Sequence, residues 1–432
     1  MKLNLNEYKH IHFVGIGGVS MYLLAIYCKN LDINVTGSDI TLNKYVQKCK
    51  DNQIIVHLGH NRKNIKGADL LVCTSAIDRN NVEITEALNN SVEVIDRADL
   101  LATICKNYKC VIGISGTHGK TTTSAMIYHI LRECGKSVSC HIGADILGAR
   151  LNPKDDYLVL ECCEYNRSFL KFDCDVAIVL NIDNDHLDCY GNMYNLRNAF
   201  RIFLKRAETR FIFDNITTKC IKNKAIRIKP PQVLSLNQFN SEGNSYLLDN
   251  VYGEHNINNA TVAVNVCLEL GLKYSKIYNA LKTFLPAGRR CQKLGVIENC
   301  DIITDYAHHP SEIKCIYDSL KLKYNDVYLI FQPHTYSRTK ILIHDFVKLF
   351  SGVDNLFIYK EYPARESKSK GYSAKKLTEY LDNAIYIKNL SQLQKWIKGK
   401  KFNFGSCVVF VGAGDINIIA EEILRKLIKR RY

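Results

Sequence analysis

A glycine-rich segment between an apolar run and a helix-forming run constrains this chain more than any other feature. The segment reads Gly116-Thr117-His118-Gly119-Lys120-Thr121-Thr122-Thr123, and it stands between apolar residues 110–115 and residues 124–131, which favour a helix. Glycines let backbone amides approach phosphate oxygens, and a helix N-terminus attracts anions. We therefore predict a phosphate-binding loop between a strand and a helix, with Lys120 on the terminal phosphates and the Thr121 hydroxyl on Mg²⁺.

The match to the general phosphate-loop pattern is incomplete. That pattern has glycine at the position of Ile114, whereas this chain has its glycine one place earlier, at Gly113. The alternative interpretation is a plain strand-turn-helix with an exposed lysine. We favour phosphate binding, because Gly-Lys-Thr falls where the strand gives way to the helix.

Composition sets broad limits on the class of protein. The chain has 432 residues, of which 47% are hydrophobic and 23% charged, as in folded proteins of two to four domains. It lacks a stretch of about 18 uncharged apolar residues, and its start lacks the apolar core of a signal peptide. We therefore expect a cytoplasmic protein without membrane insertion, a monomer or weak homodimer. The 17 cysteines form no C-x-x-C pair and are expected to be reduced thiols.

The net charge of +15 favours anionic partners. Its basic residues are dispersed, and no nucleic-acid-binding motif accompanies them. We therefore predict no nucleic-acid partner and attribute to the charge only a modest attraction for nucleotides.

The first 105 residues predict a second glycine loop, within a βαβ unit. A strand at 11–14 leads into Gly15-Ile16-Gly17-Gly18, a helix runs to about residue 30, and a second strand ends near Asp39. This order is typical of dinucleotide-binding folds, but Ser20 stands at the third glycine position of the fingerprint. Such loops bind any pyrophosphate, so NAD and a nucleotide-sugar diphosphate are both candidates.

Two acidic stretches follow predicted strands of the central region. Glu161-Cys162-Cys163-Glu164-Tyr165 follows a strand at 157–160, and residues 181–188, Asn-Ile-Asp-Asn-Asp-His-Leu-Asp, follow a strand at 176–180. The carboxyl ends of parallel strands meet at one sheet edge, so both stretches are expected beside the phosphate loop. Mg²⁺ bound to ATP is the obvious cation for them. Solvated loop acids are the alternative for any one of them, and their joint placement argues against it.

A later helix carries two asparagines on one face. Residues 253–271 predict this helix, with Asn256 and Asn259 one turn apart. Their amides suit the edge of a nucleotide base, and N-capping is an equally good interpretation.

Strand-helix alternation resumes after residue 287 and predicts a third α/β unit. Its strands are expected at 302–304, 327–331, 356–359 and 407–411. His308 and Arg338 are placed at the tops of adjacent strands, where histidines and an arginine suit a small anionic substrate.

Ten stretches in order resemble the Mur ligase family along nearly the whole chain. They are HFVGIGGVSM, TSAI, GTHGKTTT, ECCEYNRSF, NIDNDHLD, GEHNINNA, RRCQ, DYAHHPSE, FQPHTYSRT and VGAGDI. The resemblance implies an α/β fold of three domains. Residues 1–105 would form a Rossmann-like UDP-sugar domain, 106–286 a central P-loop ATPase-type parallel-sheet domain that binds ATP, and 287–432 a Rossmann-like C-terminal domain that binds the amino acid.

The resemblance also implies a reaction. The carboxylate of UDP-N-acetylmuramate would be joined to L-alanine with ATP cleavage, a step of peptidoglycan precursor synthesis. Because a carboxylate oxygen is a poor leaving group, phosphoryl transfer first makes an acyl phosphate. The alanine amine then attacks it and phosphate leaves.

Roles for single residues follow from the same resemblance. The implied catalytic residues are Lys120, His186 and His308, and the metal ligands are Thr121, Glu164 and His186. The implied ATP site comprises Gly116, Thr117, His118, Gly119, Lys120, Thr121, Thr122, Asn256, Asn259, Arg290 and Asp305. The UDP-sugar site comprises Gly15, Gly17, Gly18, His60 and Ser75, and the amino-acid site Tyr306, His308 and Arg338. Replacing Lys120 with alanine is expected to leave folding intact and to remove most activity.

The chain departs from the family pattern at several positions. Other members have Glu-Ala-Asp-Glu-Ser where this chain has Glu-Cys-Cys-Glu-Tyr, and Ala307 stands where glycine is common. Three alternatives remain: a recycling ligase that attaches a tripeptide to the same sugar, an NAD-linked oxidoreductase or regulator, and a plain ATPase or kinase. The last two leave the phosphate loop or the C-terminal histidine and arginine cluster unexplained.

Overall fold

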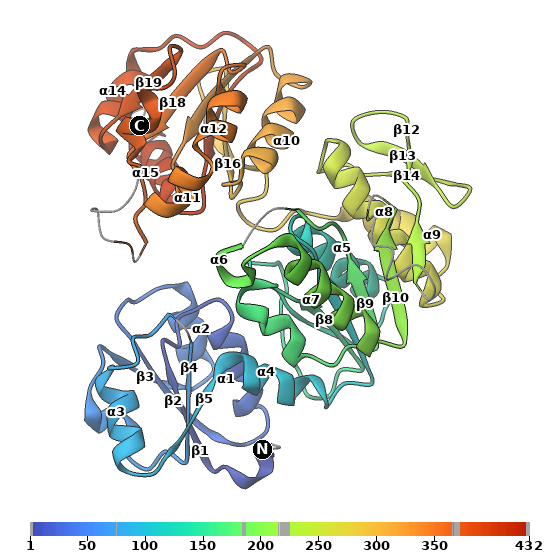
Figure 1. Ribbon diagram of the computed structural model, residues 1–432, viewed down its shortest axis with the longest axis vertical. Coiled ribbons are helices and arrows are strands. Elements are labelled where there is room, and N and C mark those ends of the chain that lie inside the picture. The colour runs from blue at the N-terminus through green and yellow to red at the C-terminus, as the bar shows by residue number, and fades with distance from the viewer. Residues whose placement is uncertain are drawn as a thin grey trace. The chain divides into compact units, whose positions relative to one another are not determined.

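The computed structural model describes residues 3–74, 76–183, 187–214, 216, 225–364, 366 and 372–428. Their contacts divide the chain into two compact units, which are described separately (Figure 1). The first unit comprises Met1–Gln232, Phe239–Asp249 and Asn258–Phe284, and the second Val233–Gln238, Asn250–Ile257 and Leu285–Tyr432. Within the described residues, no helix is both long and apolar enough to cross a membrane.

The N-terminal domain is a parallel sheet of five strands in the order β3-β2-β1-β4-β5. Its strands are β1 (His10–Val14), β2 (Asn34–Asp39), β3 (Ile55–Leu58), β4 (Leu70–Cys73) and β5 (Glu93–Asp96). Its helices are η1 (Leu5–Glu7), α1 (Met21–Lys29), α2 (Lys44–Asp51), η2 (Arg62–Ile65), α3 (Val82–Asn89) and α4 (Arg97–Cys105). The strand order reverses between β1 and β4, and ligands of such sheets bind at this switch point.

Helices cover both faces of this sheet, so its central strands β1 and β4 are largely buried. Ile11 and Phe13 of β1 pack in one core cluster with α1 residues. Val14 packs in another cluster, with Ile84 and Ala87 of α3. The first cluster continues into the middle domain, so the two domains of the first unit share one apolar core.

The middle domain contains a parallel sheet in the order β11-β10-β9-β6-β8-β7. Its strands are β6 (Cys110–Ser115), β7 (Val138–His141), β8 (Tyr157–Glu161), β9 (Val176–Val179), β10 (Thr209–Phe213) and β11 (Ile226–Ile228). Its helices are α5 (Lys120–Glu133), η3 (Tyr165–Lys171), α6 (Leu187–Tyr190), α7 (Met193–Arg206), α8 (Glu254–Glu269) and α9 (Tyr274–Thr283). β6 lies between β8 and β9, so the phosphate loop and both acidic stretches share one sheet edge, as predicted.

A small three-stranded sheet, which the sequence analysis missed, is appended to this domain. Its order is β12-β13-β14, with β12 at Gln232–Val233, β13 at Gln238–Ser241 and β14 at Asn244–Leu247. The strands are short and follow no clear alternation of apolar and polar residues, which is why their pattern gave little signal.

The C-terminal domain is a mixed sheet in the order β15-β16-β20-β17-β18-β19. Its strands are β15 (Gln292–Ile297), β16 (Cys300–Asp305), β17 (Asp326–Phe331), β18 (Asn355–Tyr359), β19 (Ala384–Ile387) and β20 (Ser406–Val411). Its helices are α10 (Pro310–Lys321), α11 (Tyr336–Ile341), α12 (Ile343–Phe350), α13 (Ala374–Thr378), α14 (Leu390–Gly399) and α15 (Ile416–Ile428). β15 is antiparallel to β16. The predicted three-domain α/β fold is confirmed, whereas the boundaries at 105/106 and 286/287 remain a prediction.

Candidate active site

The phosphate loop joins β6 to α5 through two glycines in conformations that other residues rarely adopt. Gly116 has φ 138° and Gly119 has φ 82°. A side chain at Gly119 would also clash with Oδ1 of Asn259. The amide of Thr123 donates to the Gly119 carbonyl at 2.9 Å, which closes the first turn of α5. The first amides of a helix have no carbonyl partner one turn earlier, and this is what makes a helix N-terminus attractive to an anion.

Lys120 lies over this loop and pairs with Glu164. Its Nζ donates to the carbonyls of Gly116 at 2.6 Å and Thr117 at 3.0 Å, and lies 2.9 Å from Oε2 of Glu164. Burial alone would lower the pKa of Lys120, but the charge of Glu164 raises it overall. The ammonium therefore stays protonated where terminal phosphates are expected.

This ion pair changes one expectation from the sequence. The side chains of Lys120 and Glu164 are only 13% and 2% exposed. Removing the lysine alone leaves a buried carboxylate without its cation, which is strongly destabilising. Lys120→Ala is therefore expected to weaken folding as well as nucleotide binding, instead of leaving folding intact.

Glu161 contacts the phosphate-loop helix, and the resemblance did not include it among the site residues. The Thr121 hydroxyl donates to its Oε1 at 3.0 Å, and the Gly143 amide donates to its Oε2 at 2.9 Å. Its position as the last residue of β8, beside the loop strand, was the available signal. Thr121, Glu161 and Glu164 supply hydroxyl and carboxylate oxygens, the donors that Mg²⁺ prefers.

The predicted metal ligands Thr121, Glu164 and His186 remain a prediction. His186 lies outside the described residues. Among the residues that the structure describes, no group of three or more His, Cys, Asp or Glu is arranged to hold a metal ion. Thr121 and the two glutamates are the oxygen donors at this edge, and they would fit a Mg²⁺ ion whose shell is completed by phosphate oxygens.

The loop after β9 holds the phosphate loop from the other side. The amide of His118 donates to Oδ1 of Asn181 at 2.8 Å, and Nδ2 of Asn181 donates to the His118 carbonyl at 3.0 Å. The amide of Asp183 donates to the Thr117 hydroxyl at 2.8 Å. Thr117 and His118 thus hold the phosphate loop against the loop that follows β9. The sequence motif does not indicate this role.

The predicted asparagines of α8 have different partners. Oδ1 of Asn259 accepts from the Thr123 hydroxyl at 3.2 Å, so Asn259 lies against the phosphate loop. Nδ2 of Asn256 donates to the Tyr252 carbonyl at 2.9 Å. Both lie inside the helix, which begins at Glu254, so neither is its N-cap. Their contact with a base remains a prediction.

The glycine loop after β1 is held by the carboxylate of Asp39, the last residue of β2. Oδ2 of Asp39 accepts from the Gly17 amide at 2.9 Å, and Oδ1 accepts from the amide and hydroxyl of Thr41. The amide of Gly15 donates to the Ser38 carbonyl at 2.8 Å. In NAD-binding folds the corresponding acid binds ribose hydroxyls, whereas both oxygens of Asp39 are engaged within the protein. This arrangement disfavours the NAD alternative.

His60 follows β3 at the same sheet edge. Its Nδ1 lies 3.0 Å from Oε2 of Glu83 and 3.0 Å from the Ser38 hydroxyl. Gly18 also lies at this edge, in the turn that leads to α1. Ser75, the last predicted member of this site, lies outside the described residues.

The C-terminal unit gathers its predicted residues around a second histidine. The rings of Tyr306 and His308 are 5.5 Å apart, and those of His308 and His334 are 6.2 Å apart. Burial, followed by the charges of Arg338 and His308, lowers the pKa of His334 to about 4. Nδ1 of His334 is buried and has no hydrogen-bond partner among the described residues. The sequence analysis missed His334, although it stands in the quoted stretch FQPHTYSRT.

The predicted adjacency of two strands in this unit was wrong. His308 and Arg338 were placed after adjacent strands, but β20 lies between β16 and β17 and is parallel to both. β20 begins about 75 residues after the end of β17. The local sequence around β16 and β17 therefore does not indicate that a third strand lies between them. The loops after β16 and β17 nevertheless meet, because His308 and His334 both extend from them.

Arg290 and Asp305 lie beside Tyr306 in the C-terminal unit. The guanidinium of Arg290 lies over the Tyr306 ring, 5.3 Å from its centre. Asp305 is 6% exposed, and its oxygens accept from the amides of Cys291 and Ala307, each at 2.7 Å. Burial raises the pKa of Asp305, and Arg290 opposes this rise. Asp305 therefore shapes its own loop, and its contact with ATP remains a prediction.

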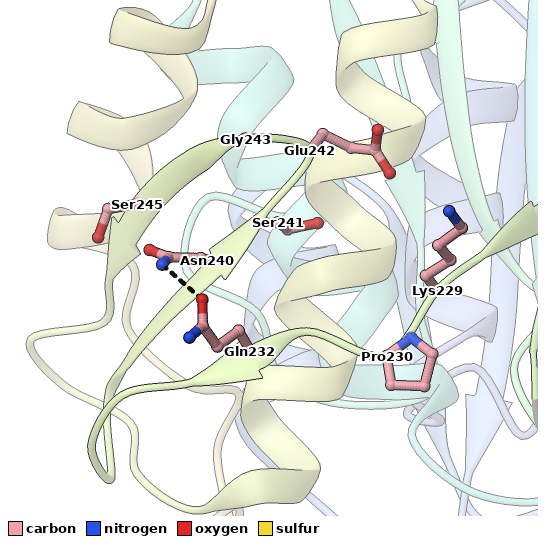
Figure 2. Close-up of a pocket in the computed structure, with 8 residues that line it drawn as sticks. All are labelled: Lys229, Pro230, Gln232, Asn240, Ser241, Glu242, Gly243 and Ser245. Atoms are coloured by element: carbon pink, nitrogen blue, oxygen red, sulfur yellow. Dashed lines mark hydrogen bonds between the residues drawn. The ribbon is translucent and has the colours of Figure 1, made fainter.

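The appended sheet lines a separate polar cavity of about 520 Å³. Lys229 and Glu242 extend along its rim, and Asn240 donates to Gln232 at 3.0 Å (Figure 2). The cavity contains none of the predicted site residues and no charged side chain that is buried. We assign it no function.

Family models match the chain in three consecutive segments. Residues 10–109 match the Mur ligase family catalytic domain, 114–250 the Mur ligase middle domain, and 289–414 the Mur ligase glutamate ligase domain. The chain is also similar to a UDP-N-acetylmuramate–L-alanine ligase of Clostridium acetobutylicum, with 37% identity over 97% of this chain and 98% of that protein. A ligase of the same name from Acetivibrio thermocellus is 34% identical over 98% and 97%.

Solved structures agree with this assignment at the level of the fold. The UDP-N-acetylmuramate-alanine ligase of Thermotoga maritima superposes with a TM-score of 0.83 and 24% identity, covering 98% of this chain and 99% of that chain. A murein peptide ligase of Psychrobacter arcticus gives a TM-score of 0.70 and 22% identity over 97% and 98%. The chain belongs to the Mur ligase family.

Proposed function

We propose that this protein joins L-alanine to the carboxylate of UDP-N-acetylmuramate with cleavage of ATP. The observation that carries the proposal is the similarity to ligases of this name, at 33–37% identity and over nearly the whole length of both chains. A recycling ligase for a tripeptide is less well supported, because its similarity lies in the fold alone.

The residues of the phosphate loop would prepare the carboxylate for attack. The Lys120 ammonium would leave Glu164 and pair with the terminal phosphates instead. Thr121, Glu161 and Glu164 would hold Mg²⁺, which supplies positive charge to the transferring phosphoryl group. The product of this step is an acyl phosphate, because phosphate is a far better leaving group than a carboxylate oxygen. His186 is a further candidate ligand, outside the described residues.

The C-terminal unit would bind the amino acid. Arg338 is the candidate partner of the alanine carboxylate, because a guanidinium can donate two parallel hydrogen bonds. His308 and His334 would enclose the small side chain. Nδ1 of His334, which has no hydrogen-bond partner in the part of the chain that the structure describes, is an atom that a substrate group would satisfy.

The test is ADP release measured with each substrate omitted in turn. The proposal requires release that depends on UDP-N-acetylmuramate, L-alanine and Mg²⁺ together, with glycine and L-serine as weak substitutes. Release that is faster with a tripeptide than with alanine would favour the recycling ligase instead. Release without any amino acid would identify a plain ATPase.

We further propose that the protein acts in the cytoplasm, without nucleic acid, as a monomer or weak homodimer. Light scattering across a concentration series checks the oligomeric state. A stable tetramer would exclude this part of the proposal.

A further inference from the structure

A fully buried carboxylate lies beneath the N-terminal site. Glu83, in the first turn of α3, is 0% exposed. Its oxygens accept from the Ser38 hydroxyl at 2.6 Å, the Asn64 amide at 2.6 Å and the Asn61 backbone amide at 3.2 Å. Burial alone would raise the pKa of Glu83, but His12, with Nε2 3.8 Å from Oε2 of Glu83, and the hydrogen bonds from Ser38 and Asn64 lower it to about 2. Glu83 is therefore an anion and only an acceptor at neutral pH.

The ionised Glu83 determines which nitrogen of His60 carries the proton. Oε2 of Glu83 lies 3.0 Å from Nδ1 of His60, and a carboxylate can only accept, so the shared proton belongs to Nδ1. The Ser38 hydroxyl, also 3.0 Å from Nδ1, already donates to Glu83. Nε2 then carries the lone pair of the neutral ring, and no described residue is its partner.

His60 lies at the carboxyl edge of the sheet, where ligands of such sheets bind. His60 follows Gly59, which has φ 84° and comes directly after β3. The Gly59 amide donates to the Asp39 carbonyl at 2.8 Å, which ties this turn to the end of β2 beside the glycine loop. The His60 side chain is 18% exposed, so one edge of the ring reaches solvent.

We propose that Glu83 is a positioning residue for the nucleotide-sugar. It holds the His60 ring with Nδ1 protonated, so that Nε2 accepts a hydrogen bond from a hydroxyl or N–H group of the ligand. This inference rests on the proposed function, because UDP-N-acetylmuramate is the ligand that supplies those donors. The alternative is that Glu83 only ties together the turns that contain Asn61 and Asn64.

Calorimetry on the full chain without ATP separates the two roles. UDP-N-acetylmuramate is titrated into the wild type, Glu83→Gln, His60→Ala and the double variant. A glutamine amide can donate to Nδ1 and so move the ring proton to Nε2, which turns the acceptor into a donor. We expect Glu83→Gln and His60→Ala each to weaken binding about tenfold, the effect of one lost hydrogen bond of about 1.4 kcal/mol. The double variant should bind no more weakly than His60→Ala.

Asp69→Asn is the matched control. Asp69 also accepts from two backbone amides, those of Lys9 and His10 at 2.8 and 2.9 Å, but it precedes β4 at the opposite sheet edge. Its variant should bind UDP-N-acetylmuramate as the wild type does. If Glu83→Gln fails to fold, Glu83→Asp keeps the charge and shortens its reach, and should give an intermediate loss that disappears in the His60→Ala background.

The outcomes distinguish this inference from the proposed function. A wild type that does not bind UDP-N-acetylmuramate refutes the proposed function, and the inference with it. Wild-type binding with unchanged affinity in Glu83→Gln refutes the inference alone. A loss of affinity that is equally large with and without His60 shows that Glu83 acts only through the structure of the turns, and also overturns the inference.

Discussion

The ion pair between Lys120 and Glu164 predicts that Lys120 contributes both to the stability of the fold and to catalysis. We consider Lys120→Met, which keeps most of the volume of the stem and removes the charge. The two charged groups are 2.9 Å apart and their side chains are 13% and 2% exposed. Breaking a buried pair by removing one partner costs about 3–5 kcal/mol, because the remaining charge is left without compensation. Lys120→Met should lose stability of this order.

A second variant separates the charge from the contact. Glu164→Gln in the Lys120→Met background removes the stranded carboxylate and leaves a neutral pair of similar shape. Replacing both partners of a buried pair by neutral groups is often close to neutral in stability. The double variant should therefore regain most of the lost stability. It should not regain activity, because an interaction of this kind with the phosphates is worth about 10²–10⁵ in rate.

Urea unfolding and ADP release measure the two effects separately. Far-UV circular dichroism follows the whole chain, whereas the single tryptophan, Trp396 in α14, reports on the C-terminal unit and serves as an internal control. The reasoning is refuted if Lys120→Met is as stable as the wild type. It is also refuted if the double variant is no more stable than Lys120→Met, since the stranded carboxylate would then not be the cause.

Three further predictions follow from particular contacts. Arg338→Lys should raise the KM for L-alanine strongly and barely change that for ATP, and equal KM values for the wild type and the variant would remove Arg338 from the amino-acid site. Gly119→Ala should weaken ATP binding and cost more stability than Gly135→Ala at the other end of α5. Both glycines have positive φ, worth roughly 1–2 kcal/mol, but only Gly119 would clash with a neighbour; equal losses in urea would contradict this. Burial, with a smaller contribution from Arg97, lowers the pKa of His141 to about 3. Below about pH 6.5, His141 therefore binds a proton in the unfolded chain but not in the folded chain. The free energy of unfolding should fall as the pH is lowered from about 6.5 towards 3. His141→Gln should reduce this slope, and an unchanged slope between pH 6 and 4 would contradict the assignment.

The elements around the phosphate loop could be predicted because their signals are local. β6 is a continuous apolar run, and Gly116 and Gly119 stand where the backbone needs positive φ. The resemblance added the order of domains and the identity of the substrates. The strand order of the N-terminal and middle sheets then placed the predicted residues after β1, β6, β8 and β9 at common edges.

The features that were missed depend on contacts between distant parts of the chain. In the sequence, Glu83 resembles an ordinary solvent-exposed acid in the first turn of a helix. Only the fold places Ser38 and His60 around it. Glu161 is distinguished from Glu164 by the Thr121 hydroxyl, 40 positions earlier in the sequence. β20 lies between β16 and β17 although it comes after both in sequence. Such pairings leave no periodicity within a local window, and so propensity and motif reasoning cannot recover them.

Both glycine loops of the first unit are closed by carboxylates of the protein itself. Glu164 pairs with Lys120 of the phosphate loop, and Asp39 accepts from the Gly17 amide of the N-terminal loop. A concave set of amides and a lysine would otherwise be an uncompensated positive site, costly to keep out of water. If ATP binds as we propose, its phosphates take over Lys120 and the released carboxylate becomes available to Mg²⁺, which arrives with the nucleotide. One anion then replaces another at the lysine, and the carboxylate gains a cation in place of the one it loses. Charge balance is preserved at each group, so the Lys120–Glu164 pair can separate when the nucleotide binds without leaving either charge uncompensated.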